Sequence, residues 1–117
     1  LITRMHSCRQ REVFICKKVN FISEYRCYIL NHQVLGVHWY KGNFFSPISE
    51  SVLSEAIKRY KPVAPIAYCL DLGVTDENKT LLVEVNDGYS MGNYGIRPYD
   101  YAAMLDARWH QMVTEKR

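Results

Sequence analysis

The sequence predicts an α+β fold, a mostly antiparallel sheet with two helices on one face. Short runs in which apolar and polar residues alternate recur along the chain, as is typical of half-buried strands. Helical spacing of apolar residues occurs in only two segments, residues 49–60 and the stretch after Pro98. Turn residues separate consecutive strands within two pairs, which favours hairpins and therefore antiparallel pairing.

Composition indicates one ordinary globular domain. The 117 residues are 48% hydrophobic and 23% charged, which is enough apolar material for a core. A net charge of +3 without a basic stripe predicts no nucleic-acid partner, and no run of residues is long and apolar enough to predict a membrane span. The four cysteines have neither Cys-x-x-Cys pairing nor zinc spacing, so we expect reduced thiols and a cytoplasmic location.

The first part of the chain gives one strand. Residues 1–11 are mixed and basic and are left as an unassigned leader, while residues 12–19 are rich in β-branched and aromatic residues and end in the pair Lys17-Lys18. The domain proper is expected to span residues 12–115. Because the sequence opens on Leu1 and not on Met, we expect it to be part of a longer protein.

A hairpin and a helix follow. Residues 24–30 and 33–40 alternate as strands, and Asn31-His32 between them suits a tight turn because Asn tolerates positive φ. The alternation places Glu24 and Arg26 on one face of the first strand. The helix of residues 49–60 has Ser49 as its expected N-cap, and prolines beyond residue 60 end it.

The second strand pair spans residues 66–74 and 79–86, joined by the turn sequence of residues 75–78. Period-two alternation predicts Glu84 and Asn86 on one face of the last strand, and Leu81, Val83 and Val85 on the other. The final helix begins near Pro98, a residue suited to the first helical position. Its expected core stripe consists of Ala102, Leu105, Trp109 and Met112.

Three oxygen-bearing side chains are expected to meet on the sheet face that the helices leave free. Hairpin pairing brings Asp71 beside Glu84 and Asn86, a donor set that suits Mg²⁺ completed by water and phosphate oxygens. Two carboxylates this close repel each other unless a cation lies between them, which favours a metal. Two plainer interpretations remain open: Asp71 caps a turn through its own backbone, or Glu84 and Asn86 are the wet side of an edge strand.

The ordered set of motifs resembles the C-terminal half of an ATP-grasp domain. The set comprises Ser23-Glu24-Tyr25-Arg26, Asp71 placed thirteen positions before Glu84, and Val83-Glu84-Val85-Asn86. The loop of residues 86–95, Asn-Asp-Gly-Tyr-Ser-Met-Gly-Asn-Tyr-Gly, is similar to one in bacterial ATP-grasp proteins. The resemblance covers about residues 12–112. It implies an ATP-grasp C-terminal subdomain that uses ATP and Mg²⁺.

Metal-binding and catalytic roles follow from the resemblance, position by position. Asp71, Glu84 and Asn86 match the residues that hold Mg²⁺ on the ATP phosphates. Glu24 matches the acidic residue that binds the ribose hydroxyls, and Arg26 matches a catalytic arginine near the γ-phosphate or the acceptor carboxylate.

The adenine contact is implied for the strand end at residues 16–19, where Lys17, Lys18 and Val19 would bind the cofactor. Lys17 departs from the family pattern, in which an acidic residue or glutamine is common at this place. The departure puts side-chain recognition of the base in doubt, whereas backbone contacts are unaffected.

The implied activity is that of a carboxylate–amine ligase. ATP phosphorylates an unknown carboxylate to an acyl phosphate, which an amine or another nucleophile then attacks. In the family a second, N-terminal half supplies phosphate-binding lysines and a glycine-rich flap. We therefore expect this chain alone to bind nucleotide weakly, to lack turnover and to self-associate through an apolar patch. The alternative function is a non-catalytic binding module that keeps the ATP-grasp sheet without its chemistry.

Overall fold

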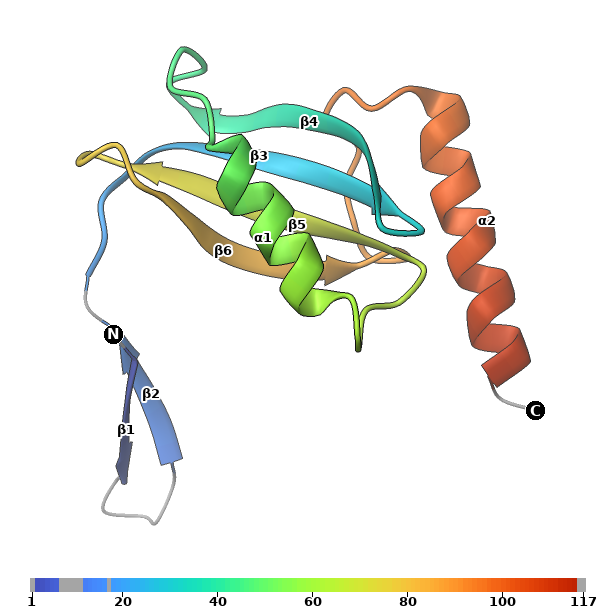
Figure 1. Cartoon of the computed structure of the whole chain (residues 1–117), viewed down its shortest axis with the longest axis horizontal. Coiled ribbons are helices and arrows are strands. Elements are labelled where there is room, and N and C mark those ends of the chain that lie inside the picture. Colours follow the sequence, from blue (N-terminus) through green and yellow to red (C-terminus); the bar gives the residue numbers. More distant parts are fainter. Residues whose placement is uncertain (1, 7–11, 17, 116–117) are drawn as a thin grey trace.

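The computed structural model describes residues 2–6, 12–16 and 18–115. β1 (Ile2–His6) and β2 (Glu12–Cys16) pair antiparallel as a hairpin of their own, a two-stranded sheet that Figure 1 shows apart from the larger sheet. The expected strand at residues 12–19 thus ends at Cys16, and its partner lies in the segment that the sequence left unassigned. Lys17 lies outside the described residues.

The larger sheet has four antiparallel strands in the order β4-β3-β5-β6. Its strands are β3 (Phe21–Leu30), β4 (Gln33–Gly42), β5 (Ala67–Thr75) and β6 (Thr80–Asp87). The helices are α1 (Glu50–Tyr60) and α2 (Pro98–Glu115). Four antiparallel strands and two helices confirm the predicted α+β class, and both predicted strand pairs are hairpins.

Local chemistry at the expected positions explains the ends of these elements. Asn31 and His32 have φ values of 49° and 66°, the left-handed conformation that a two-residue hairpin turn needs. Asn78 has φ 61° in the turn between β5 and β6. The Ser49 hydroxyl accepts a hydrogen bond of 3.4 Å from the Val52 amide, so Ser49 is the N-cap of α1 as predicted.

The helix α1 covers one face of the sheet, here called the α1 face. Leu53 is its most buried residue and packs onto side chains from the two central strands, β3 and β5 (Figure 1). The fully buried members from the sheet are Cys27, Ile29, Tyr68, Leu70 and Leu72. Cys27 and Ile29 therefore point to a helix, as the alternation predicts.

The helix α2 packs with the opposite face, so the expectation that both helices cover one face holds only for α1. The buried Met104 belongs to a second cluster of the opposite parity. Its other buried members are Tyr28, Ala67, Cys69, Met91 and Ile96. Met91 and Ile96 lie in the loop between β6 and α2, and this loop crosses the second face and gives α2 an apolar surface to pack on.

The contact face of α2 also differs from the expected stripe. Ala102 and Trp109 are exposed, the latter by 63%, whereas Met104 is fully buried. The Arg108 guanidinium donates two hydrogen bonds, of 2.6 and 3.0 Å, to the carboxylate of Asp87 at the end of β6. This ion pair sets the rotation of α2 against the sheet, a constraint that helical periodicity alone does not contain. No helix in the described ranges is long and apolar enough to cross a membrane.

A register shift in β6 reverses the predicted facing of two leucines. Asp71 pairs with Glu84, but the next pair is Leu72 with Leu82, so Val83 is an extra residue. Leu82 consequently faces α1, where it lines a groove with Val85, while the preceding residue, Leu81, pairs with Gly73 on the opposite face. Alternation within β6 therefore breaks at residue 83, and the prediction for Leu81 and Leu82 was wrong.

Candidate functional site

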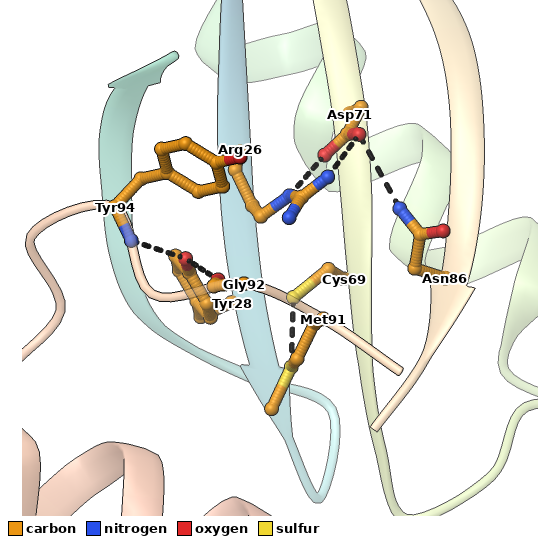
Figure 2. Close-up of polar contacts among 8 residues, drawn as sticks. All are labelled: Arg26, Tyr28, Cys69, Asp71, Asn86, Met91, Gly92 and Tyr94. Atoms are coloured by element: carbon orange, nitrogen blue, oxygen red, sulfur yellow. Dashed lines mark hydrogen bonds and ion pairs between the residues drawn. The ribbon is translucent and has the colours of Figure 1, made fainter. Parts of the chain in front are cut away.

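The centre of the site is a buried ion pair on the face opposite α1, here called the polar face. Arg26 of β3 donates from Nε and Nη2 to the two carboxylate oxygens of Asp71 on β5, each at 2.8 Å (Figure 2). Asn86 of β6 donates from Nδ2 to Asp71 Oδ2 at 3.3 Å. The three side chains that the sequence placed on one face therefore meet, since Arg26 and Asp71 are direct cross-strand partners.

Asp71 does not cap a turn. It lies in the middle of β5, is only 2% exposed and receives its hydrogen bonds from side chains of neighbouring strands. These hydrogen bonds raise the pKa of the Arg26 guanidinium further above its usual range, with burial acting in the opposite direction. Arg26 thus supplies the compensating positive charge, and the charge-repulsion argument for a metal loses its force at Asp71.

Glu84 and Asn86 differ in their surroundings. Glu84 sits opposite Asp71 in the register of the edge strand β6 and is exposed, whereas Asn86 is half-buried by its contact with Asp71. Across residues 2–6, 12–16 and 18–115, no three or more His, Cys, Asp or Glu side chains are grouped closely enough to hold a metal. The oxygen donors consist of two carboxylates and one amide, and Arg26 already engages one of the carboxylates.

Glu24 lies on the polar face two residues before Arg26, as the alternation predicts. It pairs with Gly73 of β5 on one side and with Lys41 of β4 on the other. Its carboxylate forms an exposed-side ion pair of 3.8 Å with the Lys41 ammonium, and the Glu24 side chain is otherwise mostly covered. One carboxylate is therefore held near the ion pair, on the β4 side of the sheet.

A pocket of ≈630 Å³ adjoins the polar face at the end of β5. Lys18 and Val19 line it, together with Thr75 and Leu81 from β5 and β6. The ring of Phe21 lies over Gly73 next to this region, where a Cβ on residue 73 would come within 2.3 Å of the ring. Two of the three predicted cofactor-binding residues thus border a pocket, and the third, Lys17, lies outside the described residues. Asp76, Glu77, Asn20 and Lys79 complete the lining.

The loop after β6 lies against the polar face and is held there by Tyr28. The buried Tyr28 hydroxyl donates to the carbonyl of Gly92 and accepts a hydrogen bond of 3.0 Å from the amide of Tyr94 (Figure 2). Gly88 permits the close approach at the start of the loop, because a Cβ there would come within 2.5 Å of the Ala67 carbonyl oxygen. Loop and sheet together enclose the ion pair.

Two tyrosine rings complete the enclosure of Arg26. The guanidinium carbon lies 5.0 Å from the ring centroid of Tyr40 and 5.0 Å from that of Tyr94, and the two rings meet edge to face. Tyr94 therefore packs in the site, while Tyr89 of the same loop is 58% exposed. Arg26 itself is 7% exposed. Buried among these groups, Arg26 is a structural centre as well as a candidate catalytic residue.

Sequence reasoning missed Tyr28 and Tyr40 as members of the site. For Tyr28 a signal existed, because it follows Glu24 and Arg26 at period two on the same strand. For Tyr40 none existed. A register shift between β3 and β4 makes Tyr40 an extra residue, and this brings it to the polar face beside Lys41.

Comparison with known proteins places the chain in a family. No curated protein and no solved structure matches the chain significantly. A family model described as an ATP-grasp domain, family 2 of its clade, matches residues 1–104. The match includes every candidate site residue and the loop that Tyr28 holds. The chain therefore belongs to the ATP-grasp domains, in the second family of that clade.

Proposed function

We propose that the polar face binds Mg·ATP and that the chain is the nucleotide-binding half of an ATP-grasp ligase. Family membership supports ATP-dependent chemistry of the ATP-grasp type in general. The observation that carries the finer proposal is the meeting of Arg26, Asp71 and Asn86, with the exposed Glu84 opposite Asp71. Acidic, amide and guanidinium groups on one face are the groups that metal-bound phosphates require.

The donor chemistry of the site fits Mg²⁺. Glu84 offers a free carboxylate and Asn86 an amide oxygen, while Asp71 Oδ1 accepts one hydrogen bond and keeps a second lone pair. Mg²⁺ in nucleotide sites is held by one or two carboxylates and otherwise by water and phosphate oxygens, so a small protein donor set suffices. Bound Mg²⁺ would neutralise charge on the ATP phosphates.

The nucleoside would lie toward the pocket at Lys18 and Val19. Leu81 and Val19 are apolar and partly exposed there, and Phe21 covers the sheet at Gly73, so a flat base has apolar side chains to pack on. Glu24 pairs with the same Gly73 and lies between this end of the sheet and Arg26, a place suited to the ribose hydroxyls. The phosphates would then reach Asp71, Glu84 and Asn86.

The proposed reaction is activation of a carboxylate by phosphoryl transfer. The attacking carboxylate oxygen displaces ADP from the γ-phosphorus, giving an acyl phosphate, and an amine then displaces phosphate from the acyl carbon. Such transfer depends on position and charge and needs no covalent side chain. Arg26 would offset negative charge near the γ-phosphate from its Nη1 edge, since Nε and Nη2 hold Asp71.

Several parts of the enzyme would come from outside this chain. We propose that a second, N-terminal half supplies lysines and a flexible flap over the nucleotide, that the missing contact leaves exposed apolar side chains prone to self-association, and that the protein is cytoplasmic. Phe44, Phe45 and Trp39 form an exposed aromatic group at the end of β4, which supports association. The buried, unpaired thiols of Cys27 and Cys69 support a reducing compartment.

The alternative function is a non-catalytic binding module. One observation favours it. Arg26 satisfies Asp71 fully without a metal, so the fold is complete in the absence of nucleotide. An active site and a decayed one would share this ion pair, but only the former would bind Mg²⁺ and nucleotide together.

The test is titration of the 117-residue chain with a non-hydrolysable ATP analogue, with and without Mg²⁺, followed by calorimetry and by thermal unfolding. We expect weak, Mg²⁺-dependent binding, a rise in Tm, and no phosphate release from ATP. Binding that ignores Mg²⁺, or no binding at all, would favour the alternative module. Tight binding with steady turnover would show that the chain is a complete enzyme and that no second half is required.

A further inference from the structure

One buried hydroxyl group fastens the loop after β6 to the polar face. Tyr28 is fully buried, and its hydroxyl both donates to the Gly92 carbonyl and accepts from the Tyr94 amide. A second contact lies beneath the same loop, where the thiol of Cys69 donates to the Met91 sulfur. Figure 2 shows both contacts on the side of the sheet that carries Arg26. The Tyr28 hydroxyl is thus the polar link from β3 to both sides of residue 93.

The fastened loop reaches Arg26 through Tyr94. Because the Tyr94 amide is held by Tyr28, its ring lies 5.0 Å from the Arg26 guanidinium carbon and 4.6 Å from the Tyr40 ring. The fit at Gly92 is close. A Cβ there would come within 2.9 Å of the Tyr94 ring and 3.5 Å of Arg26 Nη1. Moving the loop therefore moves the surroundings of the Nη1 edge.

We propose that Tyr28 is a positioning residue, which holds the loop so that Tyr94 fixes Arg26 in the orientation used at the phosphates. This inference rests on the proposed function, because it assigns a task to the Nη1 edge that Asp71 leaves open. Asp71 fixes one edge of the guanidinium, and the rings of Tyr40 and Tyr94 fix its faces. A group held this way is preorganised, so ordering it costs little when a ligand binds.

The discriminating variant is Tyr28→Phe, which keeps the buried ring and removes only the hydroxyl. Its matched control is Tyr25→Phe on the same strand. The Tyr25 hydroxyl donates to the Phe44 carbonyl at 2.9 Å, so this variant also removes one buried tyrosine hydroxyl bonded to a loop, but one far from Arg26. Comparing the two separates the loop's effect on Arg26 from a general loss of stability.

Three measurements follow the proposal from loop to ligand. In Tyr28→Phe, hydrogen exchange of the Tyr94 amide and alkylation of Cys69 should each accelerate about tenfold, because opening the loop no longer breaks two hydrogen bonds. Burial raises the pKa of both Cys27 and Cys69 to about 12, so alkylation of either thiol requires local opening. Cys27 on the α1 face should keep its wild-type rate, and peptide mapping separates both from Cys8 and Cys16.

The second readout is the NMR signal of the Arg26 Nε–H, which should broaden or shift in Tyr28→Phe and stay unchanged in Tyr25→Phe. The third is the dissociation constant of the Mg²⁺ complex of the non-hydrolysable ATP analogue, which should rise several-fold, up to about tenfold, in Tyr28→Phe alone.

An unchanged Arg26 signal in Tyr28→Phe would overturn the positioning role. Equal effects of the two variants on Arg26 or on the analogue would also overturn it, by showing a general loss of stability. A wild-type chain that fails to bind the analogue would instead overturn the proposed function, and the Arg26 signal would then decide the structural link by itself.

Discussion

The two faces of the four-stranded sheet are built from the same strands by opposite means. On the α1 face, Leu53 packs onto buried aliphatic and aromatic side chains, and order follows from the exclusion of apolar surface from water. On the polar face, the centre is the Arg26–Asp71 ion pair, surrounded by tyrosines and covered by a loop. Both faces exclude water at the centre of the sheet, yet only one of them contains groups able to act on a phosphate.

The difference teaches where stability and function can be separated. An apolar contact loses free energy roughly in proportion to the surface removed, and its neighbours remain satisfied. A buried ion pair behaves otherwise, because deleting one partner strands the other without solvent. Substitutions on the two faces should therefore differ in size, in reversibility and in their effect on nucleotide.

The largest effect should come from Asp71→Ala. Arg26 would keep its charge in a buried place without a counterion, which is expected to lower the free energy of unfolding by about 3–5 kcal/mol. Urea unfolding measures the loss. Glu55→Ala, which breaks the exposed pair with Arg59 on α1, is the control and should cost only about 0.3–0.5 kcal/mol. A loss below about 1 kcal/mol for Asp71→Ala would mean that the pair is solvated in solution.

Leu53→Ala should be the next largest. It removes the most buried side chain of α1 and leaves a cavity against β3 and β5, at a cost of about 2–4 kcal/mol in unfolding free energy. The polar face should be untouched, so Mg²⁺-dependent binding of the ATP analogue under native conditions should match wild type. Weaker binding in this variant would show that the two faces are coupled and that the comparison drawn above is too sharp.

A double replacement should recover stability and lose function. Arg26→Met with Asp71→Leu puts apolar groups of similar size in place of the pair, and unfolding free energy should return to within about 1 kcal/mol of wild type. Binding of the Mg²⁺–analogue complex should nevertheless disappear. If this variant is as unstable as Asp71→Ala, the pair contributes specific geometry that apolar packing does not replace.

The smallest effect on stability should be that of Glu84→Gln. Glu84 is exposed on the edge strand, so unfolding free energy should change by no more than about 0.5 kcal/mol. Binding of the Mg²⁺–analogue complex should weaken because an anionic ligand is lost, and in a complete enzyme turnover should be abolished. Calorimetry at several Mg²⁺ concentrations measures this. Near-normal affinity at ordinary Mg²⁺ would exclude Glu84 as a ligand, and Glu77→Gln in the β5–β6 turn is the control.

The sequence determined the strands, the helices, the hairpin turns and the parity of Glu24, Arg26, Asp71 and Asn86, because alternation and turn chemistry are local properties. It also carried the ATP-grasp motifs. Its reach ended wherever one residue was added to a strand. The extra residue at Val83 reversed Leu81 and Leu82, and the one at Tyr40 brought a ring to Arg26.

Only the tertiary structure decided the rest. The placement of α2 on the polar face follows from the loop that crosses the sheet and from the Arg108–Asp87 pair, which join segments far apart in the sequence. The partner of Asp71 was likewise set by strand order. Once β3 and β5 are neighbours, Arg26 lies beside Asp71 and neutralises it, and a pair of carboxylates that suggested a metal becomes an ion pair within a cage of tyrosines. Long-range register, which no local pattern encodes, made that difference.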